Sequence, residues 1–144
     1  DACQDVFAAM GTNIIYEGGA GKGQHTKMAN QIALAGAVAS VSEAIAYARR
    51  TGLDVETMLA SISKGAAGSW QMTNNAPKMV AGDMAPGFFI KHFIKDMAIA
   101  DEEAKAAGLT MPVLEEVLEM YRELDRRGEG DLGTQAVIHY FDEK

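Results

Sequence analysis

Cysteine is almost absent from this chain of 144 residues, which contains Cys3 and no other. A single cysteine cannot form a disulfide within the chain, and it belongs to no C-x-x-C pair, so a reducing, cytoplasmic setting is expected. Long apolar runs are scarce as well. None approaches the ~20 residues that span a bilayer, and none has the flanks of a signal peptide. We therefore expect neither a disulfide framework nor a membrane span.

Positive charge is also in short supply, with 13 Lys and Arg against 20 Asp and Glu and a net charge of -7. Binding to nucleic acid relies on positive charge to neutralise phosphates, so general nucleic-acid binding is not expected. A small anionic substrate stays compatible, because a few local cations suffice for it. The three histidines show no metal-ligand spacing, so no metal site is expected.

The first seventeen residues differ from the rest of the chain. A short helical pattern ends at Gly11, and Asn13–Tyr16 then has the β-forming residues of a strand. A strand cannot stand alone, and no other convincing strand follows it. We therefore predict that residues 1–17 are the tail of an upstream α/β domain of the Rossmann type, and that residues 18–144 form a separate helical domain.

Helical patterns dominate after Gly23, and the longest covers residues 24–51. Eleven of its twenty residues from Ala29 to Ala48 are Ala, Gly or Ser, so neighbouring helices can pack close to its backbone. Shorter helices are expected after Asp54, in the segment SWQMTNNA before Pro77, in IKDMAIADEEAKAAG, from Pro112 to Arg127, and from Thr134 to about Phe141. The predicted fold is all-α, a helical bundle around one long central helix.

The glycine-rich segment GGAGKGQHTKMANQ leads into the long helix, and it does not fit a nucleotide-binding motif. A P-loop requires a lysine and a Ser or Thr directly after its last glycine, and this order is not met. The start of a dinucleotide fingerprint is present, but Gln24 occupies the place of its third glycine. A nucleotide site contained within the chain is therefore not expected.

The apolar stripe of the long helix continues into polar residues near the start of the helix. Apolar residues at three- and four-residue steps form one face, comprising Leu34, Val38, Val41, Ile45 and Ala48. The same stripe, extended backwards, reaches Gln31 and Lys27, with Asn30 beside them. One interpretation is a frayed helix end from which Lys27 reaches solvent. The other is a functional group that points at whatever adjoins the domain there.

Two motifs resemble those of a known family. The pattern G-x-x-G-x-G-x-x-x-K-x-x-N-[NQ] is matched from Gly18 to Gln31, and GFFIKHFIKDMAIA is similar to a second block, G-F-x-I…K-D-L-x-x-A. Together they resemble the C-terminal helical domain of the β-hydroxyacid dehydrogenases. That family includes 3-hydroxyisobutyrate dehydrogenase, tartronate semialdehyde reductase and, more distantly, 6-phosphogluconate dehydrogenase. The similarity extends from about Asp1 to Phe141.

The resemblance implies an oxidoreductase whose NAD or NADP is bound mainly by an N-terminal Rossmann domain that this sequence lacks. It assigns Lys27 as catalytic acid/base, Asn30, Gln31 and Phe88 to the substrate, and Lys95 and Asp96 to the cofactor. The substrate would be a small carboxylate, interconverted between 3-hydroxy acid and semialdehyde or keto form. The 144 residues alone are expected to be inactive. To act as a base, the Lys27 amine needs desolvation or a neighbouring cation such as Lys95.

Simpler interpretations of the same residues stay open. Lys95 and Asp96 would open a helix, where an acid is favourable without any functional role. The whole chain could also be a non-catalytic helical dimerisation module in which Lys27 is incidental. Either way we expect a homodimer or homotetramer, because a long helix of small residues buries well against a partner and an exposed strand is prone to association.

Overall fold

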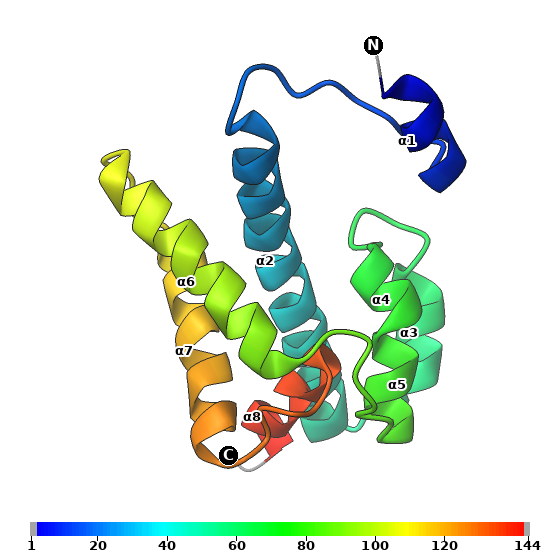
Figure 1. The fold of residues 1–144 in the computed structure, drawn as a ribbon. Coiled ribbons are helices and arrows are strands. Elements are labelled where there is room, and N and C mark those ends of the chain that lie inside the picture. Colours follow the sequence, from blue (N-terminus) through cyan, green and yellow to red (C-terminus); the bar gives the residue numbers. More distant parts are fainter. Residues whose placement is uncertain (1–2, 143–144) are drawn as a thin grey trace.

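The computed structural model describes residues 3–142, and across this range it contains helices and no strand (Figure 1). The elements in chain order are α1 (Gln4–Met10), α2 (Lys22–Thr51), α3 (Val55–Ile62), α4 (Trp70–Asn74), α5 (Ala76–Ala81), α6 (Ile90–Ala106), α7 (Pro112–Arg126), the 3-10 helix η1 (Thr134–Ile138) and α8 (His139–Asp142). The all-α prediction is therefore confirmed. The predicted domain boundary after residue 17 stays a prediction. Residues 1–2 and 143–144, which the two predicted domains include, lie outside the described range.

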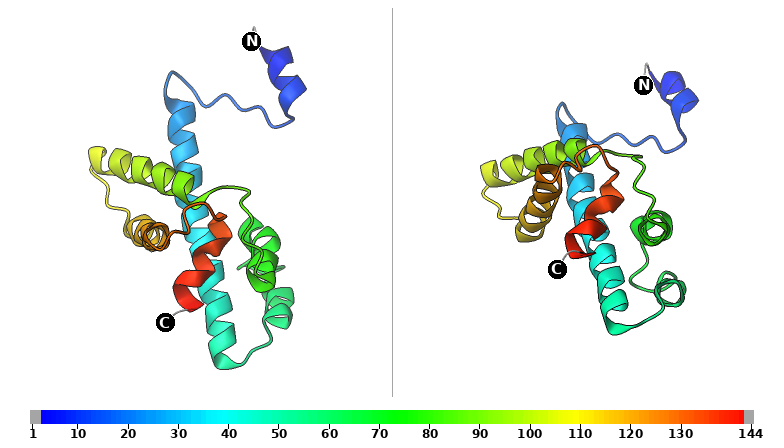
Figure 2. Two further views of the ribbon diagram at one scale, coloured as in Figure 1. Left: turned by 60° about the horizontal axis from the view of Figure 1, so that its bottom comes forward. Right: turned by 90° about the horizontal axis from the view of Figure 1, so that it is seen from below.

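Helix α2 runs through the middle of the molecule, as the small-residue pattern predicts. Helices α6 and α7 pack on one side of it and α3, α4 and α5 on the other (Figures 1 and 2). Left-handed glycines border it at both ends, Gly21 with φ 88° and Gly52 with φ 76°. Small residues allow close approach: a Cβ added to Gly36 would meet Val113 at 3.7 Å. The predicted range of 24–51 is correct to within two residues.

The core lies where α2, α6, α7 and η1 meet. The predicted stripe of α2 is buried at Val38, Val41, Ile45 and Ala48. By length and composition α2 would also be able to cross a membrane, yet it carries the core contacts of this bundle. Phe93 of α6 is fully buried and makes edge-on ring contacts with Phe88 and Tyr121. These rings connect the core to the loop before α6.

The helix expected before Pro77 is present as α4, which ends at Asn74, and Pro77 itself stands in the first turn of α5, where its missing N–H costs nothing. Three sequence predictions require correction. Residues Asn13–Tyr16 form no strand, because no described segment pairs with them. Helix α6 begins at Ile90, so Lys95 and Asp96 lie in its second turn. The terminal helix is split into η1 and the short α8.

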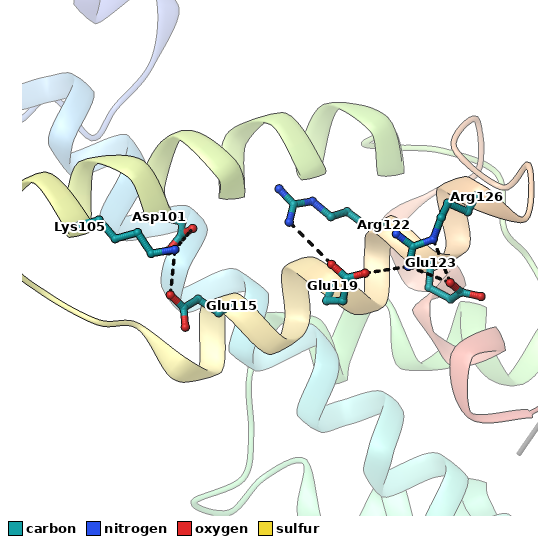
Figure 3. A network of polar contacts seen from close by, with 7 residues as sticks. All are labelled: Asp101, Lys105, Glu115, Glu119, Arg122, Glu123 and Arg126. Carbon is teal, nitrogen blue, oxygen red and sulfur yellow. Dashed lines mark hydrogen bonds and ion pairs between the residues drawn. The ribbon is translucent and has the colours of Figure 1, made fainter.

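Ion pairs connect α6 to α7 on the surface. Lys105 lies 2.8 Å from Asp101 on its own helix and 3.0 Å from Glu115 on α7 (Figure 3). Hydrogen bonds to these two carboxylates raise the pKa of Lys105. Further along α7, Arg126 pairs with Glu119 and Glu123 (Figure 3). Apart from Asp101, these side chains are 36–58% exposed, so the ion pairs add little to stability.

Replacing Tyr121 with phenylalanine is expected to lower the free energy of unfolding by about 1–2 kcal/mol at pH 7. The buried hydroxyl donates a hydrogen bond of 2.6 Å to the carbonyl of Thr134, which links α7 to η1. The measurement is urea unfolding of the wild type and the variant. Tyr47→Phe is the matched control, because Tyr47 is 66% exposed and should change stability by under about 0.5 kcal/mol. Equal effects of the two substitutions would contradict the prediction.

Because this hydroxyl is buried, we also expect the free energy of unfolding to fall at alkaline pH. Burial raises the pKa of Tyr121 well above its ordinary value of 10.0. A group whose pKa is higher in the folded state contributes stability that is complete below the unfolded pKa and is lost as pH rises from there. Unfolding measured from pH 9 to pH 11.5 should therefore show a steeper decline above about pH 10 in the wild type than in Tyr121→Phe.

Candidate active site

The buried carboxylate of Asp96 is the centre of the candidate site. Its residue is 9% exposed, on the face of α6 that packs against the first half of α2. The amide nitrogen of Gln31 donates to Asp96 Oδ2 at 2.9 Å. The amide nitrogen of Asn30 in turn donates to Gln31 Oε1 at 2.9 Å. This chain of hydrogen bonds fixes both amides of α2, and it leaves Asp96 little surface of its own for a ligand.

Two lysines flank the same carboxylate. Lys27 Nζ lies 3.9 Å from Asp96 Oδ2, and Lys95 Nζ lies 3.2 Å from Asp96 Oδ1. Their side chains are 52% and 65% exposed, so both ammonium groups reach the surface. Lys27 Nζ also stands 5.9 Å from the centre of the Phe88 ring, within the range of a cation–π contact. One acid therefore lies between two cations, Lys27 of α2 and Lys95 of α6.

The environment of Lys27 differs from the sequence expectation in one respect. Its amine was expected to be desolvated or to face another cation, whereas it is half exposed and pairs with Asp96. The described residues therefore position the Lys27 amine at the surface, beside a carboxylate.

Beside Lys27 lies a hollow of about 360 Å³, which we call the Lys27 hollow. It is lined by Lys27, Asn30, Gln31, Leu34, Trp70, Gln71, Asn75, Lys78, Gly87, Phe88, Thr134 and Gln135. The structure thus brings the predicted catalytic and substrate residues to one cavity, while Lys95 and Asp96 do not line it. Segments from α2, α4, α5, η1 and the loop before α6 meet there.

Several lining residues escaped the sequence analysis. Gln71 and Asn75 are buried and joined by a hydrogen bond of 2.6 Å. Their four-residue spacing was visible in the sequence, but no local pattern showed that they would line a hollow together with Lys27. Trp70 is 66% exposed and also lines the Lys27 hollow.

Gln135 was also missed, and it holds the loop that carries Phe88. Its buried amide nitrogen donates to the carbonyls of Asp83 at 3.0 Å and Ala85 at 2.9 Å. The carboxamide occupies the space that a side chain at Gly133 would need. Nearby, the backbone N–H of Thr134 donates to the carbonyl of Phe88 at 3.0 Å. The end of the chain therefore fixes the Phe88 loop over Lys27, a long-range relation that no local pattern encodes.

Across residues 3–142, no group of three acidic, histidine or cysteine side chains is placed to hold a metal ion. The polar groups at the Lys27 hollow are ammonium groups, carboxamides and a hydroxyl. Such groups bind and orient an oxygen-rich molecule, and an amine of this set can exchange a proton with it.

Comparison with known proteins identifies the family. Residues 21–141 match the family model described as "NAD-binding of NADP-dependent 3-hydroxyisobutyrate dehydrogenase". The chain is 52% identical over 137 residues to "Uncharacterized oxidoreductase YkwC" of Bacillus subtilis (strain 168), a match that covers 95% of the chain and 48% of the relative. It is 41% identical over 133 residues to "Probable 3-hydroxyisobutyrate dehydrogenase-like 1, mitochondrial" of Arabidopsis thaliana, with 92% of the chain and 40% of the relative covered.

A solved structure agrees with these matches. The crystal structure of 3-hydroxyisobutyrate dehydrogenase from Salmonella typhimurium superimposes with a TM-score of 0.88 at 29% identity, and the match covers 95% of this chain and 48% of that one. The chain spans about half the length of the curated relatives it matches. The family model, the relatives and the all-helical fold together show that the chain belongs to the 3-hydroxyisobutyrate dehydrogenase family of β-hydroxyacid dehydrogenases.

Proposed function

We propose that this chain is the substrate-facing, C-terminal part of an NAD(P)-dependent oxidoreductase that interconverts a small 3-hydroxy acid and its semialdehyde or keto form. The observation that carries the proposal is the position of Lys27. Its ammonium group stands at the Lys27 hollow, held by the buried Asp96 and backed by Asn30 and Gln31. Support also comes from the family, which is described as NAD-binding.

In this proposal the nicotinamide supplies or accepts the hydride at the reacting carbon. Oxidation of the hydroxyl then requires that its proton leave, and reduction of the carbonyl requires that a proton arrive. We assign that transfer to Lys27 Nζ, which takes the proton from the hydroxyl oxygen or returns it. Asn30, one helical turn further along α2, donates to a substrate oxygen and keeps that oxygen in line with the amine. The Phe88 ring lies 5.9 Å from the Lys27 ammonium nitrogen and bounds the position of the amine.

The described residues fit one edge of a nicotinamide cofactor and not the whole of it. Lys95 offers an exposed ammonium group beside Asp96, which suits a ribose hydroxyl or a phosphate. The glycine-rich entrance to α2 lacks the third glycine of a dinucleotide fingerprint. We therefore assign most of the cofactor contact, and the closure that desolvates Lys27, to sequence outside these 144 residues.

The test is an assay of the full-length protein with a panel of short 3-hydroxy acids and semialdehydes, with NAD and NADP and their reduced forms. Turnover is followed as the absorbance of the reduced nicotinamide. We expect turnover of at least one acid in the full-length protein and none by the 144-residue chain alone. Micromolar affinity of NADH for the 144-residue chain would contradict this division of labour.

The rival proposal is a helical association module, and one observation favours association. The apolar side chains of α1 are exposed, with Val6 at 60%, Phe7 at 48% and Met10 at 73%. Helix α1 also stands away from the bundle (Figures 1 and 2). We propose that this segment packs against further protein, either the cofactor-binding part or a second subunit of a homodimer or homotetramer. Association of this kind is compatible with catalysis by Lys27.

A further inference from the structure

The charge around the Lys27 hollow is opposite to that of the chain. The chain carries a net charge of -7, whereas the residues that line the hollow include the two cations Lys27 and Lys78. None of the described residues that line it is acidic. A concave surface with positive charge alone attracts an anion and concentrates it there.

Lys78 differs from Lys27 in having no counter-charge. Across residues 3–142, no hydrogen bond or ion pair joins its side chain to another residue, whereas Lys27 pairs with Asp96. Lys78 is partly buried on α5, beside the buried amides of Gln71 and Asn75. Because none of the described residues pairs with the Lys78 ammonium group, all of its N–H donors are available to an anionic ligand.

The wall next to Lys78 is polar and fixed. Gln71, Asn75, Thr134 and Gln135 are each at least 93% buried. Hydrogen bonds hold the amides of Gln71 and Asn75 to each other and that of Gln135 to the loop before α6. An alkyl substituent placed here would cover the Lys78 ammonium group without supplying a counter-charge, whereas a second carboxylate would supply one.

From these observations we infer that Lys78 is a specificity-determining residue, which binds a second anionic group at the end of the substrate away from the reacting carbon. The inference rests on the proposed function, and it deepens that function by naming the substrate class. The preferred substrate is a 3-hydroxy acid that carries two anionic groups, rather than one with an alkyl branch. Its reacting oxygen meets Lys27, and its second carboxylate meets Lys78.

Two acids of matched skeleton test this in the full-length protein. 3-Hydroxyisobutyrate carries a methyl branch, and 2-(hydroxymethyl)butanedioate carries a carboxymethyl branch at the same carbon. We expect the wild type to prefer the diacid in kcat/KM. Lys78→Gln should raise KM for the diacid about tenfold to a hundredfold, because a charge-assisted contact is lost, and should leave kcat and the KM for 3-hydroxyisobutyrate unchanged. The KM of the nicotinamide nucleotide should also stay unchanged.

Lys64→Gln is the matched control, since Lys64 is an exposed lysine in the segment after α3 that does not line the hollow. Lys64→Gln should change neither kcat nor KM for either acid. Equal kinetics of both acids, or an equal effect of Lys78→Gln on both, would overturn the inference while the proposed function stands. A rise in KM for the nucleotide in Lys78→Gln would reassign the cation to the cofactor and would also overturn it. If the wild type turns over other acids of the panel but neither of these two, the inference is overturned, and if it turns over none of the panel, the proposed function itself fails.

Discussion

Replacing Lys27 with methionine should lower kcat of the full-length protein by about 10²–10⁴-fold, the usual contribution of a positioned acid/base. Methionine keeps most of the length of the side chain and removes the amine. Because the Lys27 side chain is 52% exposed and lies outside the core, the fold should persist. The measurements are steady-state kinetics and thermal unfolding of the same preparations. KM should change less than kcat, since proton transfer occurs at the transition state.

Lys22→Met is the control for this experiment. Lys22 is an exposed lysine of the same helix, one turn before Lys27, and it does not line the hollow. The control removes the same charge from the chain and should retain nearly full activity. If Lys27→Met kept more than about a tenth of the wild-type kcat, the assignment of acid/base catalysis would be wrong. Loss of assembly with normal turnover would instead favour the rival association module.

The central helix was predictable because several independent sequence features indicate it. A stripe of apolar residues, a left-handed glycine after Arg49 and Arg50, and many small residues all indicate one long buried helix. Gln31 and Lys27 extend that stripe, and the structure shows the reason: Gln31 is buried and hydrogen-bonded to Asp96 on α6. The polar continuation of an apolar face was therefore a genuine signal of an interior polar contact.

Other parts of the site were not predictable from local pattern. The sequence indicated that a helix ends before Pro77, but not that a second helix, α5, begins at Ala76 directly after it. Gln135 meets Asp83 and Ala85 across some fifty residues of sequence, so its role depends on the path of the whole chain. The predicted strand at Asn13–Tyr16 failed for the opposite reason, since β propensity has no effect without a pairing partner.

Replacing Phe93 with alanine should lower the free energy of unfolding by about 3–5 kcal/mol. The ring is fully buried in the core. It contacts Tyr121 with ring centres 5.1 Å apart and Phe88 with centres 5.8 Å apart. Its removal leaves a cavity between α6 and α7 that the surrounding helices fill only in part. Denaturant unfolding of the chain, followed by circular dichroism, measures the loss.

Because the Phe93 ring packs against Phe88, the same substitution should also lower activity at the candidate active site. Phe88 loses its edge-on partner, so its hold over Lys27 loosens and kcat falls, even where the protein is still folded. Phe93→Leu fills most of the volume and should cost under about 1.5 kcal/mol, while it still removes the ring contact. Ile99→Ala on the same helix is the control, since Ile99 is 41% exposed. A kcat that stays at the wild-type value in Phe93→Leu would show that the position of Phe88 does not depend on the core ring.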